Sequence, residues 1–291
     1  MKHALPVTIF LVLLFLAAQY IGLFVLDRYI DVEKTQATGV VEFKELPSVG
    51  PVQIERPKVE PQVSFWYILA AILIGTVLIL IIIKLNVQLL WKLWFFAAVV
   101  ITLTIALGAF MTGWVAFVVS LVLTWFKIFR PNVYLHNFTE LLVYGGLAVI
   151  FVPILNVPVM LLLLVVLSFY DMYAVWKSEH MIKMAKFQAQ SGIFAGMLIP
   201  YELPKTIPKG ARVVKKNVHT AVLGGGDIGF PLMFAGTVMK MLGFASALVI
   251  PLFAGAALLG LLYFGQQKKF YPAMPFLTIG CVIGFLLVWL L

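Results

Sequence analysis

The feature that most constrains this chain is its series of long apolar runs without a charged residue. The longest extends from Leu93 to Phe126, 34 residues with no Asp, Glu, Lys or Arg. A helix needs roughly 20 mainly apolar residues to cross the hydrocarbon core of a bilayer. Over the whole chain 63% of residues are hydrophobic and 11% are charged, whereas soluble domains are about 45–50% apolar and about 25% charged. The sequence therefore predicts a polytopic membrane protein and excludes soluble enzymes, disordered regulators and secreted disulfide scaffolds.

Nine apolar segments are candidates for membrane-spanning helices. The first begins like a signal peptide, but its 22 residues exceed the roughly 7–15 of a cleaved apolar region, so we expect it to be retained. The 34-residue run is long enough for two short spans, with Gly108 and Gly113 near the turn. We expect an all-α integral membrane protein, a single polytopic domain over residues 1–291. Its spans cover approximately 5–26, 65–83, 89–108, 110–126, 139–155, 157–176, 219–239, 242–264 and 273–291.

The positive charges are distributed unequally between the two sides of this arrangement. With nine spans, 15 of the 21 Lys and Arg residues lie on the side of the amino terminus. Five of the other six lie in one loop, residues 27–64, which also carries seven acids. Because Lys and Arg collect in cytoplasmic loops, the amino terminus is predicted to be cytoplasmic and the carboxyl terminus external. The net charge of +9 therefore indicates orientation in the membrane, and we expect no nucleic-acid partner.

Two loops outside the membrane are long enough to carry structure of their own. The external loop, residues 27–64, contains four prolines, so we expect little helix there and a short strand near residues 40–44. The cytoplasmic loop, residues 177–217, begins with a segment to Gln190 that suits a helix lying along the interface. The following apolar segment, Gly192–Ile199, either docks on the membrane and gates access to the interior or is a disordered loop.

Only three of the 12 acidic residues fall within or at the edge of a predicted span: Glu140, Asp171 and Asp227. A carboxylate in the middle of a bilayer costs about 3 kcal/mol even on the gentler insertion scales, so it needs a reason to be there. Glu140 lies at the cytoplasmic end of its span beside His136 and Asn137. Solvation at the interface is sufficient to explain Glu140, which leaves Asp171 and Asp227.

These two aspartates are expected to reach a similar depth from the same face of the membrane. Asp171 lies six residues before Lys177, and Asp227 lies ten residues after Asn217, on antiparallel spans. At about 1.5 Å per helical residue, they lie roughly 9 Å and at most about 15 Å inside the boundary. Two facing carboxylates in a low dielectric share a proton, so one can act as a base on water while the other polarises a carbonyl. A proton or cation path would use the same residues, and position alone does not separate a hydrolase from a transporter.

Three glycines precede the second aspartate, in the sequence Gly224-Gly225-Gly226-Asp227. Glycines remove side chains where another backbone approaches closely, although they also permit tight helix packing. Two other short motifs accompany this one in a fixed order along the chain: Tyr170-Asp171 in the preceding span and Pro272-Ala273-Met274-Pro275 at the start of the last.

With these three motifs the chain resembles the presenilin and signal peptide peptidase family of GxGD intramembrane aspartyl proteases. The resemblance covers nearly the whole chain and implies that Asp171 and Asp227 are catalytic. It implies that Tyr170, the three glycines and Pro272–Pro275 position the acids or the substrate. Met274 stands where the family has Leu, a volume-conserving exchange that should be tolerated. Gly225 fills the variable position, and we expect it to loosen this segment and shift substrate preference.

The resemblance also implies orientation, reaction and partners. The orientation predicted from the charges is that of presenilins, and the compact chain is similar to archaeal presenilin homologues, which implies the archaeal cell membrane. The implied reaction is hydrolysis of peptide bonds within transmembrane segments of membrane-protein substrates, without metal or cofactor. The substrate helix must unwind first, and we expect the segment Pro272–Pro275 to help hold it as an added strand. The sequence does not decide whether the protein forms homo-oligomers or needs accessory subunits, or whether the loop 177–217 is cleaved.

Two other function classes remain as alternatives. A proton- or cation-coupled transporter would use the same buried acids, and a structural scaffold would need neither. No spacing of His180 and His219 suggests a metal site, and the single cysteine, Cys281, cannot form a disulfide within the chain.

Overall fold

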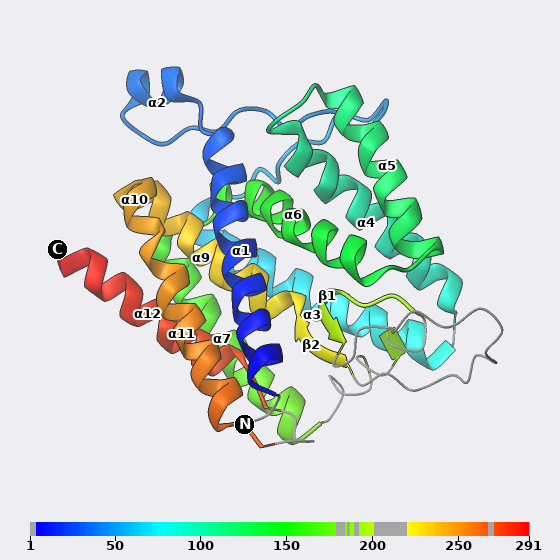
Figure 1. Ribbon diagram of the computed structural model, residues 1–291. Helices are drawn as coiled ribbons and strands as arrows, with labels where there is room; N and C mark the ends of the chain where they lie inside the picture. Colours follow the sequence, from blue (N-terminus) through cyan, green and yellow to red (C-terminus); the bar gives the residue numbers. More distant parts are fainter. Residues whose placement is uncertain are drawn as a thin grey trace, which may run out of the picture.

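The computed structural model describes residues 4–85, 87–178, 184, 187–188, 192–200, 220–266 and 271–290. Within these ranges the chain is mostly helical, with two short strands (Figure 1). The helices are α1 (Leu5–Arg28), α2 (Val32–Thr38), α3 (Pro61–Leu85), α4 (Gln88–Gly108), α5 (Gly113–Phe129), α6 (Val133–Phe151), η1 (Val152–Ile154), α7 (Val157–Trp176), α9 (Gly225–Leu242), α10 (Phe244–Ala247), α11 (Val249–Phe264) and α12 (Met274–Leu290). The strands are β1 (Gly196–Pro200) and β2 (Thr220–Gly224).

The helices support the prediction of a polytopic membrane protein. In the part of the chain that the structure describes, six helical segments are long and apolar enough to cross a membrane. Two further apolar helices, α5 and α12, are shorter. The turn that divides the 34-residue uncharged run lies between Gly108 and Gly113, where the sequence placed it.

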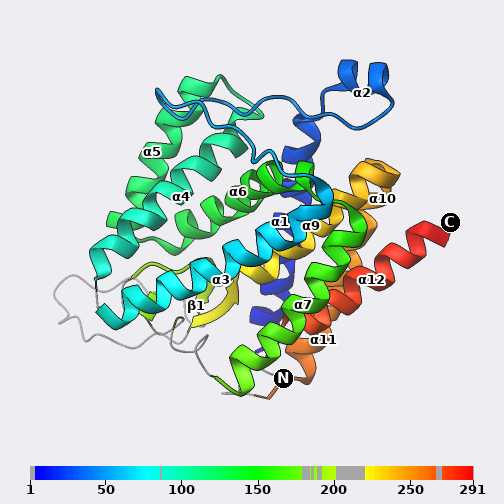
Figure 2. The ribbon, with the colours of Figure 1, turned by 180° about the vertical axis from the view of Figure 1, so that it is seen from behind.

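Helix α9 occupies the middle of the bundle, in contact with α1, α6, α7, α11 and α12 (Figure 1). Its residues Leu232, Phe234 and Ala235 are completely buried. Helix α1 approaches α9 closely because Gly22 has no side chain: a Cβ there would lie 2.3 Å from Leu232 Cδ2. Helix α3, in contrast, lies on the outside of the bundle against α4 and α7 (Figure 2). Only 11% of the residues in its most apolar stretch are buried.

The break between α6 and α7 is stabilised by polar side chains at the helix ends. The Asn156 side chain caps α7 by accepting a hydrogen bond from the Val159 N–H at 2.9 Å. From the end of α9, Lys240 Nζ donates to three carbonyls of η1 and its C-cap residue, where helical hydrogen bonding ends. The acceptors are Val152 O (3.1 Å), Pro153 O (3.0 Å) and Leu155 O (2.7 Å).

The loop 27–64 contains more helix and less strand than its sequence predicted. Helix α2 forms there because the Asp31 side chain caps it, accepting from the Lys34 N–H. The expected strand near residues 40–44 is reduced to a single bridge between Ile30 and Phe43. Arg56 ties the loop to the bundle, with Nε donating to Val149 O at 3.0 Å.

The segment between α7 and α9 differs most from the sequence prediction. The span expected at 219–239 begins as strand β2, which pairs with β1 in antiparallel register, Gly196 opposite Gly224. Thr220 and Val222 favour extended backbone, and the helix begins only at Gly225. Met197 and Ile199 in β1 are 0% and 6% exposed, so neither membrane docking nor a disordered loop is correct for this part of the apolar segment. The expected interfacial helix, 177–190, lies largely outside the described residues.

Candidate active site

Asp171 lies on α7 and is 3% exposed. Its Oδ2 accepts a hydrogen bond at 3.1 Å from the backbone N–H of Met274. Because Met274 is the first residue of α12, its N–H has no acceptor within that helix. Two motifs that are 103 positions apart in the sequence, Tyr170-Asp171 and Pro272–Pro275, are therefore in direct contact.

The neighbouring turn of α7 forms a second polar contact with α12. Ser168 Oγ lies 2.9 Å from Thr278 Oγ1, and the Thr278 hydroxyl also donates to Leu164 O at 3.3 Å. Tyr170 is directed toward a different helix, since its hydroxyl donates to Thr76 Oγ1 on α3 at 3.3 Å. Helix α7 is thus held on one face by α12 and through Tyr170 by α3.

Asp227 lies in the first turn of α9, three residues after the N-cap Gly224, and is half-buried. Helix α9 packs against α7, the helix that carries Asp171. A strand, not a helix, leads up to this aspartate, so the depth estimate for a fully helical segment does not apply. Asp227 thus lies at the amino-terminal end of α9, which carries the positive end of the helix dipole.

The three glycines before Asp227 have different surroundings. A Cβ on Gly224 would lie 3.1 Å from Asp227 Oδ2, so the absence of a side chain there leaves room for the carboxylate. A Cβ on Gly225 would lie 3.2 Å from the Tyr144 hydroxyl and 3.4 Å from Ala195 O. Gly226 is exposed, and a Cβ there would meet only the Phe230 ring at an ordinary 3.6 Å.

The sequence analysis missed a buried polar cluster next to these glycines. Lys127, Glu140 and Tyr144 are 4%, 2% and 3% exposed. The Glu140 carboxylate forms an ion pair with Lys127 and accepts a hydrogen bond from the Tyr144 hydroxyl. The prediction that solvation at the interface is sufficient to explain Glu140 is therefore wrong. The available signal was Lys127 in the last turn of the preceding helix, one of two cations, with Arg130, that come shortly before Glu140 in the sequence.

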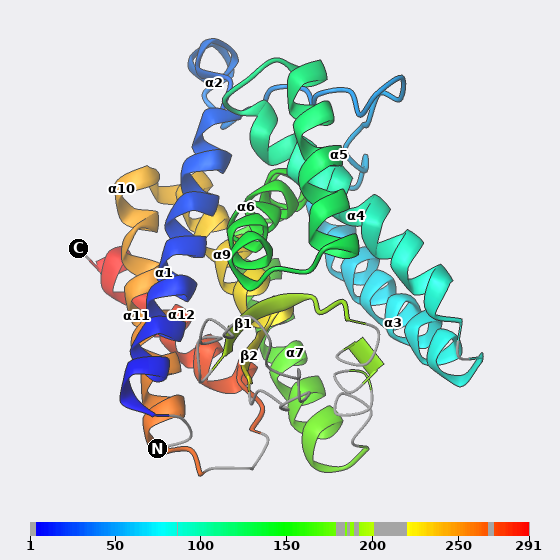
Figure 3. The same cartoon turned by 45° about the vertical axis from the view of Figure 1, so that its right-hand side comes forward.

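Helix α6 lies beside β1 (Figure 3) and holds it through two side chains of its first turns. The Asn137 amide donates to Leu198 O at 2.7 Å and accepts from the Leu198 N–H at 3.0 Å, as a neighbouring strand would. A ring nitrogen of His136 lies 2.7 Å from Gly196 O. The outer edge of β1 is therefore occupied by α6, and β2 lies on the other side of β1.

Comparison with known proteins identifies the family. The family model described as signal-peptide peptidase, presenilin aspartyl protease matches residues 36–291, a range that contains both aspartates and the segment Pro272–Pro275. The chain belongs to this family. No curated protein matches the chain.

Two solved structures show that the presenilin-family fold extends over the whole chain. Both are described as a presenilin family intramembrane aspartate protease, in the P2 and C222 space groups. The first has a TM-score of 0.64 at 19% identity and covers 99% of this chain and 98% of its own. The second has a TM-score of 0.60 at 19% identity, with 97% and 98% covered. Together with the family match, they identify this presenilin-family chain as an aspartic endopeptidase and a multi-pass membrane protein.

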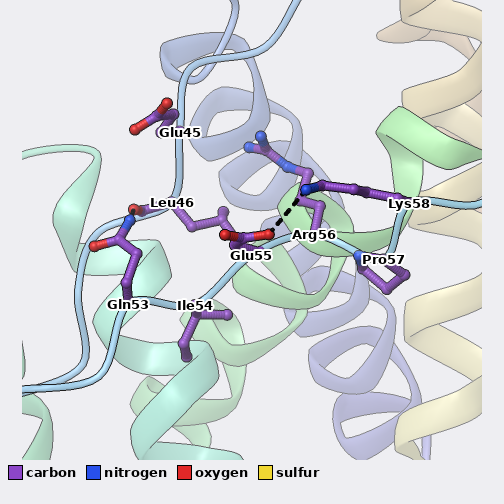
Figure 4. A pocket seen from close by; sticks show the side chains of 8 residues that line it. All are labelled: Glu45, Leu46, Gln53, Ile54, Glu55, Arg56, Pro57 and Lys58. Atoms are coloured by element: carbon purple, nitrogen blue, oxygen red, sulfur yellow. Dashed lines mark hydrogen bonds and ion pairs between the residues drawn. The ribbon is translucent and has the colours of Figure 1, made fainter.

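A cavity of about 380 Å³ lies in the loop 27–64 of this presenilin-family chain (Figure 4). Glu45, Arg56 and Lys58 are among its lining residues, and Lys58 forms an ion pair with Glu55 at 3.2 Å. None of the site residues expected from the sequence lines this cavity. Within the described ranges, no group of three or more His, Cys, Asp or Glu side chains is arranged to hold a metal ion.

Proposed function

We propose that Asp171 and Asp227 are the catalytic pair with which this protease hydrolyses peptide bonds inside the transmembrane segments of its substrates. The observation that carries the proposal is the hydrogen bond from the Met274 N–H to Asp171, which joins two of the three family motifs. The third motif is supported by the packing of α9, the helix of Asp227, against α7.

The chemistry follows from two carboxyl groups that share one proton. The ionised carboxylate removes a proton from a water molecule, and that water attacks the carbonyl carbon of the scissile peptide bond. The protonated carboxyl donates its proton to the carbonyl oxygen, which gives a tetrahedral intermediate. The carboxyl that took the proton from water then gives it to the peptide nitrogen as the C–N bond breaks, and the carboxylate that donated recovers its proton from the intermediate's hydroxyl as the C=O bond re-forms, so that an amine and a carboxylic acid leave. The half-buried position of Asp227 supports this role, because water must reach the pair from the aqueous side.

A helical substrate must lose its internal hydrogen bonds before its carbonyls can be attacked. We propose that the unwound stretch lies along β2 and the segment Pro272–Pro275 as an added strand. The support is that the Asn137 amide occupies the outer edge of β1, whereas in the described residues β2 pairs with β1 alone. Such a strand would lead directly to Asp227, three residues beyond the end of β2.

We also propose that residues 1–291 form one domain with nine spans, a cytoplasmic amino terminus and an external carboxyl terminus. A helix occurs in each of the nine apolar segments, and the distribution of Lys and Arg supports the orientation. The buried Cys281 permits labelling of introduced cysteines over a low background. In intact cells, Lys58→Cys should react with an impermeant maleimide and Lys177→Cys should not. The reverse pattern would contradict the orientation.

The catalytic assignment is tested by cleavage of a model single-span substrate in proteoliposomes. Asp171→Asn and Asp227→Asn should each lower the cleavage rate at least about 1,000-fold, since either carboxyl alone lacks its partner in proton transfer. Glu55→Gln in the external loop, whose side chain is 70% exposed, is the matched control and should cleave at the normal rate. Normal cleavage by either aspartate variant would refute the pair.

Transport assays on the same proteoliposomes separate this proposal from the transporter alternative. A transition-state analogue of aspartic proteases should block cleavage by the wild-type protein. Flux of protons or cations that both aspartate substitutions abolish, with no cleavage by the wild-type protein, would favour the transporter.

A further inference from the structure

The cluster formed by Lys127, Glu140 and Tyr144 has no part in the catalytic pair, yet it is buried as deeply as Asp171. Its ion pair joins the last turn of α5 to α6. Removing two charges from water is costly, and attraction between them offsets that cost only where further hydrogen bonds satisfy the remaining oxygens. The Tyr144 hydroxyl supplies such a bond to the second carboxylate oxygen of Glu140.

This arrangement fixes the tyrosine ring in one position. Tyr144 lies one helical turn after Glu140 on α6, a spacing that places the two side chains on the same face. The hydroxyl hydrogen is used toward Glu140, which is itself held by Lys127. The ring and its oxygen therefore form a rigid surface on this side of α6.

The first turn of α9 rests on that surface. The Tyr144 hydroxyl oxygen lies 3.2 Å from the place of a Cβ on Gly225, and ring atom Cδ1 lies 3.9 Å from that of Gly229. On the other side, the Gly225 N–H donates to Ala195 O at 3.1 Å. Residue 225 is thus enclosed between α6 and the segment before β1, two residues before Asp227. Tyr144 and Asp227 are also within electrostatic range of each other.

We propose that Tyr144 is a positioning residue for the protease reaction, held by the Lys127–Glu140 ion pair and acting on Asp227 through its contact with Gly225. The tyrosine occupies the space that the side chain of a larger residue 225 would need, so Tyr144 and Gly225 complement each other. This inference rests on the proposed role of Asp227. It assigns a function to a buried ion pair that the catalytic pair leaves unexplained.

The first test compares two identical substitutions on α6. Tyr144→Phe keeps the ring but removes the hydroxyl, and it should lower kcat about 10-fold with KM within about twofold of wild type, because the acid is displaced while the binding surface remains. Tyr134→Phe, on the first turn of the same helix and 70% exposed, is the control and should change neither constant. An unchanged kcat for Tyr144→Phe would overturn the proposal. So would a loss of folded protein with unchanged kcat per folded molecule.

The second test is a double-mutant cycle with Gly225→Ala. The added methyl group should displace the Tyr144 hydroxyl and lower kcat about 30-fold, whereas the double variant with Tyr144→Phe should be no more than about threefold worse than Gly225→Ala alone. Loss in the double variant equal to the product of the single losses, about 300-fold, would show independent effects and overturn the proposal.

Asp227→Asn, measured in parallel, separates this inference from the proposed function. An inactive Asp227→Asn beside a fully active Tyr144→Phe refutes only the positioning role. An active Asp227→Asn refutes the catalytic pair itself.

Discussion

The two aspartates occupy contrasting surroundings. Asp171 is held where α7 meets α12, 3% exposed, by a backbone N–H of Met274. Asp227 is half-buried at the junction of β2 and α9, beside Gly224. Asp171 is held by a backbone N–H, a group that every residue except proline possesses. Asp227, in contrast, has room for its carboxylate only because residue 224 has no side chain.

This difference explains which departures from the family pattern the fold accepts. Met in place of Leu at 274 leaves the N–H that reaches Asp171 unchanged, so the hydrogen bond does not depend on that side chain. A side chain at 224, in contrast, would meet the carboxylate of Asp227 directly. The α9 junction should therefore be the more sensitive of the two to conservative substitution.

The largest effect that would sharpen this comparison is expected at Gly224. Gly224→Ala places a methyl group 3.1 Å from Asp227 Oδ2 and should lower kcat about 100-fold through displacement of the acid. Gly260→Ala on α11 is the control, because a Cβ there has no heavy atom within 4 Å, and it should keep the wild-type rate. Gly226→Ala meets only an ordinary contact and should change KM more than kcat. Equal loss of kcat in the 224 and 226 variants would contradict this distinction.

A smaller effect is expected from removing the Met274 N–H, one of two backbone donors to Asp171 beside that of Ala273. Met274→Pro deletes the N–H at the first position of α12, where proline is compatible with a helix, and should lower kcat about 10-fold. Met274→Leu retains the donor and the approximate volume and should cleave within about twofold of wild type. An equal loss of kcat in Met274→Leu and Met274→Pro would show that the Met274 side chain, and not its N–H, holds Asp171.

The smallest effect is expected at the second contact between α7 and α12. Ser168→Ala removes one of the two partners of the Thr278 hydroxyl, which keeps Leu164 O, and should cost about 1 kcal/mol of stability, measured by thermal unfolding in detergent. Cleavage per folded molecule should change less than about twofold, because the Met274 N–H still holds Asp171. A tenfold loss of kcat in this variant would show that the whole α7–α12 face, and not one backbone donor, positions the acid.

The helices could be predicted from sequence more closely than the segment that leads into the active site. The predicted range 157–176 coincides with α7, because an apolar run bounded by proline and Lys177 specifies its own ends. The segment Thr220–Gly224 is also largely apolar, but it forms a strand because β1 offers backbone partners. That partner is about 20 residues away in the sequence, so local hydropathy does not report it.

The polar residues of the candidate site also differ in whether the sequence could predict their role. Asp171 and Asp227 could be selected from sequence because few carboxylates fall within apolar runs. The role of Glu140 could not, since its burial depends on Lys127 from the preceding helix and on Tyr144. A charge near the end of a predicted span is compatible with either solvent or a buried partner until the helices are packed.

The sequence by itself determined the membrane class and the two aspartates that need explanation, because the cost of burying a charge restricts where acids occur. The family motifs added the expected chemistry. Only the tertiary structure decided that a backbone N–H of Met274 holds Asp171, that a strand precedes Asp227, and that Tyr144 lies against Gly225. These features depend on backbone donors and on close approaches between distant segments, and neither has a signature in residue type or spacing.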